Sequence, residues 1–126
     1  MEWKLEVVTV PAADIDRSKR FYAEQLGFNV DVDSVMGTDF RIVQLTPPGS
    51  ACSVTIGTGL KAGLQLVVAD IEAAHAELAG RGVEVSSVRH MEDGAWADGK
   101  GGPWNGFFFF SDPDGNDWAV QEKPEM

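Results

Sequence analysis

The sequence is poor in cysteine and in long apolar runs. Cys52 is the single cysteine among 126 residues, so neither an intrachain disulfide nor a cysteine zinc cage can form. No apolar run approaches the ~20 residues that cross a bilayer, and the first residues lack the basic and apolar segments of a signal peptide. We therefore expect a cytoplasmic protein with no membrane partner, in which Cys52 packs as a small apolar side chain.

Positive charge is also scarce. Ten Lys and Arg residues stand against 20 Asp and Glu residues, which gives a net charge of −10. Such a field repels polyanions, so no nucleic acid is expected as a partner. The acidic excess is explained either by solubility or by attraction of a cationic ligand. Hydrophobic residues make up 44% and charged residues 24%, which is typical of one globular domain over residues 1–126.

The first half of the chain predicts the element order β-α-β-β-β. A β-rich segment over residues 5–10 precedes Asp14, which stands at the N-cap of a helix that Gly27 ends. Strands are then expected over residues 28–35, 40–45 and 51–56, because turn signals separate these stretches. This first module spans about residues 3–58.

The second half repeats this order. Residues 64–70 match residues 8–14 at an offset of 56, and Asp70 caps a second helix that ends at residues 80–82. Strands are expected over residues 83–89, 107–110 and 118–121, with a Gly-rich insertion over 91–106. The second module spans about residues 63–122. Since each helix covers only one face of its sheet, we expect an α+β fold in which two βαβββ modules pair into a curved mixed sheet around a cleft.

Two motifs carry a family resemblance over the whole chain. One is residues 10–18 running into Phe21 and Tyr22, and the other is the turn Ser111-Asp112-Pro113-Asp114-Gly115-Asn116. Together with the duplication, they resemble the vicinal oxygen chelate superfamily, which includes glyoxalase I, the extradiol dioxygenases, fosfomycin-modifying enzymes and bleomycin resistance proteins. The resemblance implies the glyoxalase/bleomycin-resistance fold with a ligand in its cleft.

The resemblance also implies where a metal ion would bind. In metal-using members, four ligands, mostly His, Glu or Gln, face the cleft from symmetry-related strand positions. The matching positions here are Val7, Ser53, Gly63 and Ala119, and none is a suitable ligand. A shift of two residues keeps the same face of each strand but supplies no histidine and no pair of carboxylates. We therefore expect no metal site and no cofactor.

The residues of the cleft face follow from strand alternation. We place Val7, Thr9, Ser53, Gln65 and Gln121 there, which gives an apolar and neutral-polar wall without charge. Such a wall suits a flat or amphipathic organic molecule held by a few amide and hydroxyl hydrogen bonds.

Aromatic residues near the second module complete the predicted ligand site. The run Phe107 to Phe110 must send alternate rings to opposite faces, and we place Phe107 and Phe109 in the cleft. Trp96 and Trp104 lie on the Gly-rich insertion. This insertion is either a lid over a ligand or a loop whose tryptophans are covered by its own packing or by a partner subunit.

No catalytic residue can be assigned with the usual motifs, and His90 is the candidate considered. It ends a predicted strand beside Glu92 and Asp93, so a carboxylate neighbour can raise its pKa toward that of a general acid or base. The alternative is an ordinary solvated histidine at a strand end. His75 lies inside the second helix and is interpreted as a partly exposed helix residue.

These features favour a binding protein over an enzyme. The first hypothesis is a metal-independent member of the superfamily that sequesters a small aromatic or cationic molecule, as the bleomycin resistance proteins do in antibiotic resistance, and works as a homodimer. The alternative is a glyoxalase- or dioxygenase-like lyase or isomerase, with a displaced metal site or metal-free acid–base chemistry. A third hypothesis is an accessory module whose cleft is closed by its own side chains.

Overall fold

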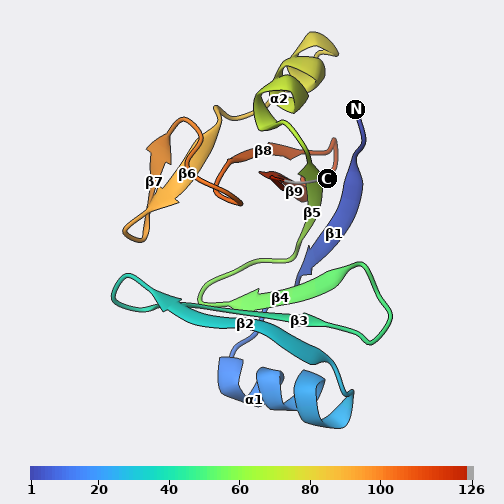
Figure 1. Cartoon of the computed structure of the whole chain (residues 1–126), viewed down its shortest axis with the longest axis vertical. Coiled ribbons are helices and arrows are strands. Elements are labelled where there is room, and N and C mark those ends of the chain that lie inside the picture. The colour runs from blue at the N-terminus through green and yellow to red at the C-terminus, as the bar shows by residue number, and fades with distance from the viewer. Residues whose placement is uncertain (125–126) are drawn as a thin grey trace. The chain divides into compact units, whose positions relative to one another are not determined.

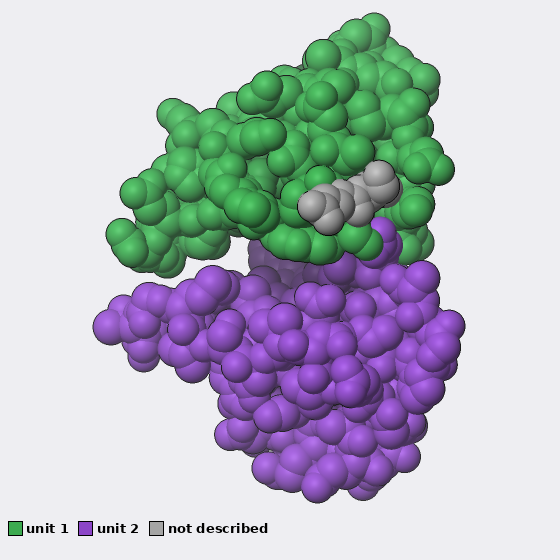
Figure 2. All heavy atoms as spheres, in the orientation of Figure 1, with its two compact units in different colours: residues 1–5, 64–126 green, residues 6–63 purple. Residues whose placement is uncertain are grey.

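The computed structural model describes residues 1–124 and divides the chain into two compact units (Figure 2). One unit is residues 6–63, and the other joins residues 1–5 to the chain from Leu64 onward. The N-terminal residues belong to the latter because Trp3 packs against its core and donates a hydrogen bond from Nε1 to Glu77 Oε2 at 3.1 Å. Within residues 1–124, no helix is long and apolar enough to cross a membrane.

The unit of residues 6–63, which we call module 1, contains four strands in the order β2-β3-β4-β1. β1 runs parallel to β4, and the other neighbours are antiparallel. Its helix is an α-helical segment that continues as one turn of π-helix, and Figure 1 shows it along one face of the sheet. The elements are β1 (Lys4–Thr9), α1 (Ile15–Arg20), η1 (Phe21–Gln25), β2 (Asn29–Met36), β3 (Phe40–Thr46) and β4 (Ser53–Gly57).

The helix of module 1 begins where the sequence predicts. Asp14 is extended, and its Oδ1 accepts a hydrogen bond from the Arg17 amide at 3.1 Å, as an N-cap does. The core lies between this helix and the sheet, with Val43, Leu45 and Ile56 fully buried. Residues next to them in the strands point to the opposite face, which α1 does not cover.

The second unit, module 2, contains five strands in the order β5-β9-β8-β6-β7. Asp70 caps α2 by accepting hydrogen bonds from the amides of Glu72 and Ala73. α2 covers one face of this sheet, where Phe108 and Val120 are fully buried with Ile71 (Figure 1). The elements are β5 (Gly63–Val68), α2 (Ile71–Gly80), β6 (Arg89–Glu92), β7 (Ala95–Asp98), β8 (Phe107–Ser111) and β9 (Asp117–Glu122).

The strand predicted over residues 83–89 is wrong, because only Arg89 of this stretch is in a strand. Ser86 disrupts the ladder beside β8. Its amide donates to the Phe109 carbonyl at 2.9 Å, but the Phe109 amide donates to Ser86 Oγ rather than to the Ser86 carbonyl. That carbonyl is in contact with His75 Nε2 at 2.9 Å instead. A serine side chain thus replaces the backbone acceptor that a regular strand would supply.

The insertion over residues 91–106 is also more regular than the sequence analysis expected. Its first part forms the antiparallel hairpin β6–β7, with Met91 opposite Trp96 and Glu92 opposite Ala95. Asp93 and Gly94 form the turn and both have positive φ, 51° and 81°. This is the backbone of a two-residue type I′ turn, for which Asp-Gly is a favoured sequence.

The α+β fold and the βαβββ order of both modules are confirmed, with the hairpin β6–β7 supplying the first strand after α2. The single-domain assignment, the module boundaries and the cleft between the modules stay predictions.

Candidate functional site

An aromatic cluster forms on the face of the module 2 sheet that α2 does not cover. The rings of Phe107 and Phe109 are parallel within 2°, with centroids 6.4 Å apart. Trp96 stands edge-on to both, at 5.4 Å from Phe107 and 5.3 Å from Phe109. The intervening Phe108 is fully buried on the α2 face. The predicted alternation of this run is therefore present, and the hairpin adds a third ring.

Two amide side chains lie on the same face as this cluster. Gln121 is opposite Phe107 in the β8–β9 ladder, so their side chains share a face. Gln65 donates from Nε2 to Gln121 Oε1 at 2.6 Å, and Gln121 donates from Nε2 to the Trp104 carbonyl at 2.8 Å. The chain of bonds fixes the orientation of both amides. Each amide keeps hydrogen-bonding capacity that these contacts do not use.

Trp104 is the second tryptophan of the insertion. Its ring has Lys123 Nζ at 5.6 Å from the centroid, a cation–π distance, and its backbone has a positive φ of 64°. Asn105 holds this part of the insertion against β6: its side chain accepts from the Met91 amide at 2.8 Å and donates to the Met91 carbonyl at 2.9 Å. Trp96 and Trp104 remain about half exposed, at 45% and 47%.

The predicted site residues of module 1 are Val7, Thr9 and Ser53, whose side chains are aliphatic or carry a hydroxyl and include no aromatic ring. Val7 and Ser53 are register partners, as are Thr9 and Thr55, so all four side chains share the face opposite α1. Ser53 Oγ lies 2.7 Å from Thr46 Oγ1, and Thr46 Oγ1 in turn donates to the Asp31 carboxylate. Ser53 thus belongs to a hydroxyl chain that ends on a carboxylate.

The positions at which metal-using relatives hold their ligands do not fit a metal ion. Val7, Gly63 and Ala119 have no side-chain donor atom, and the Ser53 hydroxyl is bonded to Thr46. Among residues 1–124, no group of three or more His, Cys, Asp or Glu side chains could hold a metal ion.

Both nitrogens of His90 are engaged. Nδ1 is 2.8 Å from the Gly99 carbonyl oxygen, and Nε2 is 3.1 Å from Glu92 Oε2. The Gly99 carbonyl, and to a lesser extent Glu92, raise the pKa of His90. His75 is partly buried in α2, with its ring edge-on to Phe108 at 5.2 Å. Cys52 is partly buried just before β4.

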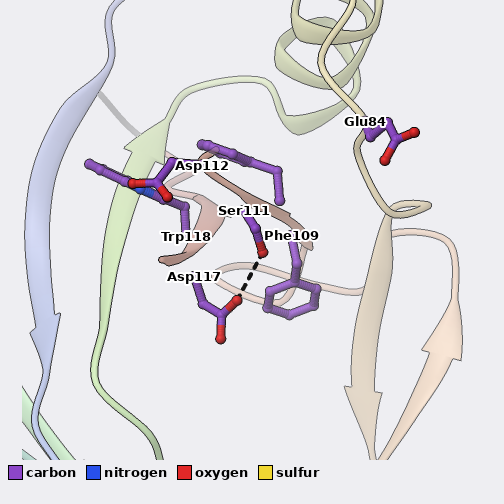
Figure 3. Close-up of a pocket in the computed structure, with 7 residues that line it drawn as sticks. Glu84, Phe109, Ser111, Asp112, Asp117 and Trp118 are labelled. Carbon is purple, nitrogen blue, oxygen red and sulfur yellow. Dashed lines mark hydrogen bonds between the residues drawn. The ribbon is translucent and has the colours of Figure 1, made fainter. Parts of the chain in front are cut away.

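A hollow of about 620 Å³ opens at the end of β8 and β9 in module 2. Figure 3 shows Asp117 and the Phe109 ring projecting toward the same space, with Ser111 Oγ donating to Asp117 Oδ1 at 2.9 Å between them. Its lining combines aromatic and acidic side chains. The lining residues are Glu84, Phe109, Phe110, Ser111, Asp112, Asp117 and Trp118.

Of these residues, sequence reasoning placed only Phe109 in a site. Trp118 shares the α2 side of the sheet as expected, but its ring stacks on Phe110 at 5.9 Å, with the planes 7° apart. The acidic turn that forms the rim was visible as a motif, and its position beside an aromatic strand is the signal that could have found the hollow.

The rim of the hollow is a rigid turn. Asp112 Oδ1 accepts from the amides of Asp114 and Asn116, both at 2.9 Å, and Oδ2 accepts from Asn116 Nδ2 at 2.8 Å. The Asn116 side chain and backbone amides hold the pKa of Asp112 below its usual value. Gly115, with a φ of 83°, closes the turn in a conformation that favours glycine.

Duplicated βαβββ modules, the capped helices and this turn define the class of protein. The chain belongs to the Glyoxalase/Bleomycin resistance protein/Dioxygenase superfamily, whose family model matches residues 4–120.

Comparison with known proteins supports the fold. One curated relative is the uncharacterized protein YetH of Bacillus subtilis (strain 168), 24% identical, with 94% of this chain and 98% of the relative covered. Methylmalonyl-CoA epimerase from Mycobacterium tuberculosis has the same fold, with a TM-score of 0.72, 20% identity and 94% and 87% of the chains covered. TnmS3, an antibiotic binding protein from Streptomyces sp. CB03234, is 28% identical over 95% of each chain, with a TM-score of 0.39.

Proposed function

We propose that this protein binds a small planar aromatic or cationic molecule, without a metal ion, on the module 2 face that carries Phe107, Phe109 and Trp96. It acts as a binding protein that sequesters its ligand, and a role in antibiotic resistance is part of the proposal. The observation that carries it is the three-ring cluster beside a pair of oriented amides.

The aromatic cluster supports a planar ligand because of its exposure and geometry. Trp96 is 45% exposed although it touches two rings, so part of its apolar surface is available. Aromatic groups prefer offset-stacked or edge-to-face contacts, and the two parallel phenylalanine rings with a perpendicular indole offer both. The amides of Gln65 and Gln121 supply the few polar contacts that orient such a ligand.

Charge supports the cationic alternative. The net charge of −10 attracts cations. Phe109, one of the cluster rings, also lines the hollow that contains the carboxylates of Glu84 and Asp117 (Figure 3). A cationic substituent on an aromatic ligand would find both cation–π and ionic partners there. The same charge disfavours nucleic acid as a partner.

The enzyme alternative, a lyase or isomerase, has less support. His90 was the candidate acid or base, and both of its ring nitrogens are already in contact with protein oxygens. A general acid or base needs a nitrogen within hydrogen-bond reach of the substrate. This chemistry would require the contact with Gly99 or Glu92 to break first.

We further propose a cytoplasmic homodimer, in which Val7, Thr9 and Ser53 also contribute to the ligand site. Support comes from the outermost strand of module 1, β2, where Val32 is 41% and Val35 is 63% exposed. A twofold partner would bury such an edge. Light scattering at micromolar concentration gives twice the mass of the chain if this is correct, and the monomer mass would contradict it.

The binding proposal is tested with prodan, a neutral planar naphthalene dye, and proflavine, a planar cation. Titration of either dye should quench tryptophan fluorescence and raise the melting temperature of the protein. Trp96→Ala should weaken binding by about 0.5–1.5 kcal/mol beyond the lost contact area, and Trp104→Ala should also weaken binding while the fold is retained.

Phe21→Ala is the matched control. The exposed fraction of Phe21, 46%, is close to the 45% of Trp96, but Phe21 lies in η1 and is not among the residues assigned to the ligand site, so its loss should leave dye binding unchanged. Equal affinities of the parent, Trp96→Ala and Phe21→Ala proteins would overturn the assignment of the site. No quenching and no thermal shift with any dye would favour a closed accessory module instead.

A further inference from the structure

The hairpin that carries Trp96 is attached to the rest of its sheet at few points. β6 pairs with β8 only at Arg89 and Phe107, although β6 and β7 pair with each other along their whole length. Besides this pair, Asn105 bonds to Met91, and the Gly99 amide donates to the Val88 carbonyl at 2.9 Å. The position of Trp96 therefore depends on a small number of contacts around the base of the hairpin.

His90 makes two further contacts, both within the hairpin and the residue that follows it. Its Nδ1 meets the carbonyl of Gly99, the residue after β7, and its Nε2 meets the carboxylate of Glu92 at the end of β6. The imidazole thus links the loop that follows β7 to the strand that precedes it. The His90 side chain is only 19% exposed, whereas that of Glu92 is 65% exposed.

The chemistry of the two partners requires a protonated ring. A carbonyl oxygen and a carboxylate oxygen are both acceptors, and only the imidazolium has an N–H on each nitrogen. In the neutral ring, one nitrogen lone pair would face an oxygen at 2.8 or 3.1 Å, so that contact would break. The exposed Glu92 side chain is the partner that can turn away into water.

We propose that His90 is a pH-sensitive positioning residue, whose protonated ring bonds Gly99 and Glu92 together and so holds the β6–β7 hairpin with Trp96 against Phe107 and Phe109. This inference deepens the proposed function, on which its effect on ligand binding rests. The contact with Glu92 lies within β6 and fixes the orientation of the ring, whereas the contact with Gly99 joins β6 to the residue after β7. Deprotonation frees the ring to turn, the Gly99 contact across the hairpin weakens, and the aromatic site loses its third ring for part of the time.

Among the charged groups near His90, Glu92 is the one in contact with its ring. Arg89 and Asp98 are opposite each other in the β6–β7 ladder, and Asp93 lies in the turn. Lys100 follows Gly99 in the chain but bonds to the Glu122 carboxylate at 3.2 Å. The pKa of His90 is raised from its ordinary 6.5 by its bonds to Gly99 and Glu92, in agreement with this geometry.

The experiment follows the hairpin directly as well as ligand binding. Imidazole nitrogen shifts measured by NMR should show His90 protonated on both nitrogens below a midpoint above 6.5. Between about pH 5.5 and about pH 8.5, protection factors of the β6–β7 amides should fall about two- to fivefold, as expected for loss of a partly exposed ionic contact. The affinity for prodan, which does not titrate in this range, should fall by a similar factor.

Glu92→Gln is the informative variant. Its amide can donate to the neutral Nε2, so the contact no longer requires a proton and both readouts should become flat with pH. Unchanged protection factors in the parent, or the same pH dependence in Glu92→Gln, would overturn the role of His90. Hairpin protection that titrates as expected without any prodan binding would support that role and refute the proposed function.

Discussion

Modules 1 and 2 use the same order of elements to present different chemistry. The helix-free face of module 1 carries the hydroxyl side chains of Thr9, Ser53 and Thr55, whereas that of module 2 carries Gln65, Gln121 and the aromatic cluster. In both modules a hydrophobic core packs between the opposite face of the sheet and the helix. The two modules therefore share the pattern of buried residues beneath the helix, and they differ mainly in the side chains on the face that the helix leaves free.

The cores also differ where module 2 buries a charged side chain. Glu122 stands 66 residues after Ile56, and both are buried beneath the helix of their module. Ile56 packs among apolar side chains, but Glu122 accepts hydrogen bonds from the Ile71 amide and Lys100. A carboxylate at the start of α2 satisfies an amide that has no partner within the helix and is favoured by the helix dipole.

The largest expected effect comes from Phe108→Ala, which removes the buried ring of module 2. It should lower the free energy of unfolding by about 3–5 kcal/mol, measured by urea denaturation, because a cavity remains under α2. Phe107→Ala is the matched control on the other face of the sheet. It should lower the free energy of unfolding less than Phe108→Ala does, and it should weaken dye binding more. Equal stability losses in the two variants would contradict the assigned faces.

Glu122→Ala should have the next largest effect. It leaves the Ile71 amide and Lys100 without their acceptor, and we expect a loss of about 1–3 kcal/mol in unfolding free energy. Glu122→Gln keeps one acceptor oxygen and should lose less. If Glu122→Ile, which copies module 1 at this position, were as stable as the parent, the carboxylate would have no structural role in module 2.

Smaller effects are expected on the pH dependence of stability, and these have opposite signs in the two modules. In module 1, hydrogen bonds from Arg41 hold the pKa values of Asp16 and Asp33 below their usual 3.8, with Lys19 also bonded to Asp33. This network stabilises the fold above pH 3.8 and is lost as the pH falls through the lowered pKa values. The raised pKa of His90 means that its contribution is complete below pH 6.5 and is lost as the pH rises through the raised value.

Thermal unfolding at several pH values checks both signs. Arg41→Ala should lower the melting temperature more at about pH 7 than at about pH 2, and His90→Asn should lower it more at about pH 5.5 than at about pH 8.5. The reverse order for either variant would show that the corresponding charge contact does not stabilise its module.

No effect is expected from divalent metal ions. Val7, Gly63, Ser53 and Ala119 give neither module a donor set, so added Zn²⁺, Ni²⁺, Mn²⁺ or Fe²⁺ should leave the melting temperature unchanged. A site present at 100 times its dissociation constant would instead stabilise the protein by about 2.7 kcal/mol. A saturable shift would therefore contradict the expectation that the protein binds no metal ion.

Local signals in the sequence were sufficient for much of the fold. Asp14 and Asp70 start their helices as predicted, because an N-cap depends only on the next three residues. The strand predicted over residues 83–89 failed because Ser86 substitutes its hydroxyl for a backbone acceptor, which depends on a partner 23 residues away. The β6–β7 hairpin was missed although Asp93-Gly94 is a favoured type I′ turn.

The sequence by itself determined the duplication, the helix caps, the rigid turn at Asp112 and the face to which each phenylalanine of β8 points, because all of these depend on short-range periodicity and local hydrogen bonds. Only the tertiary structure decided that Trp96, and not Trp104, meets Phe107 and Phe109, and that His90 bonds on both sides. Those contacts join segments through the register of a hairpin and the path of a loop, and neither is encoded in the spacing of residues along one strand.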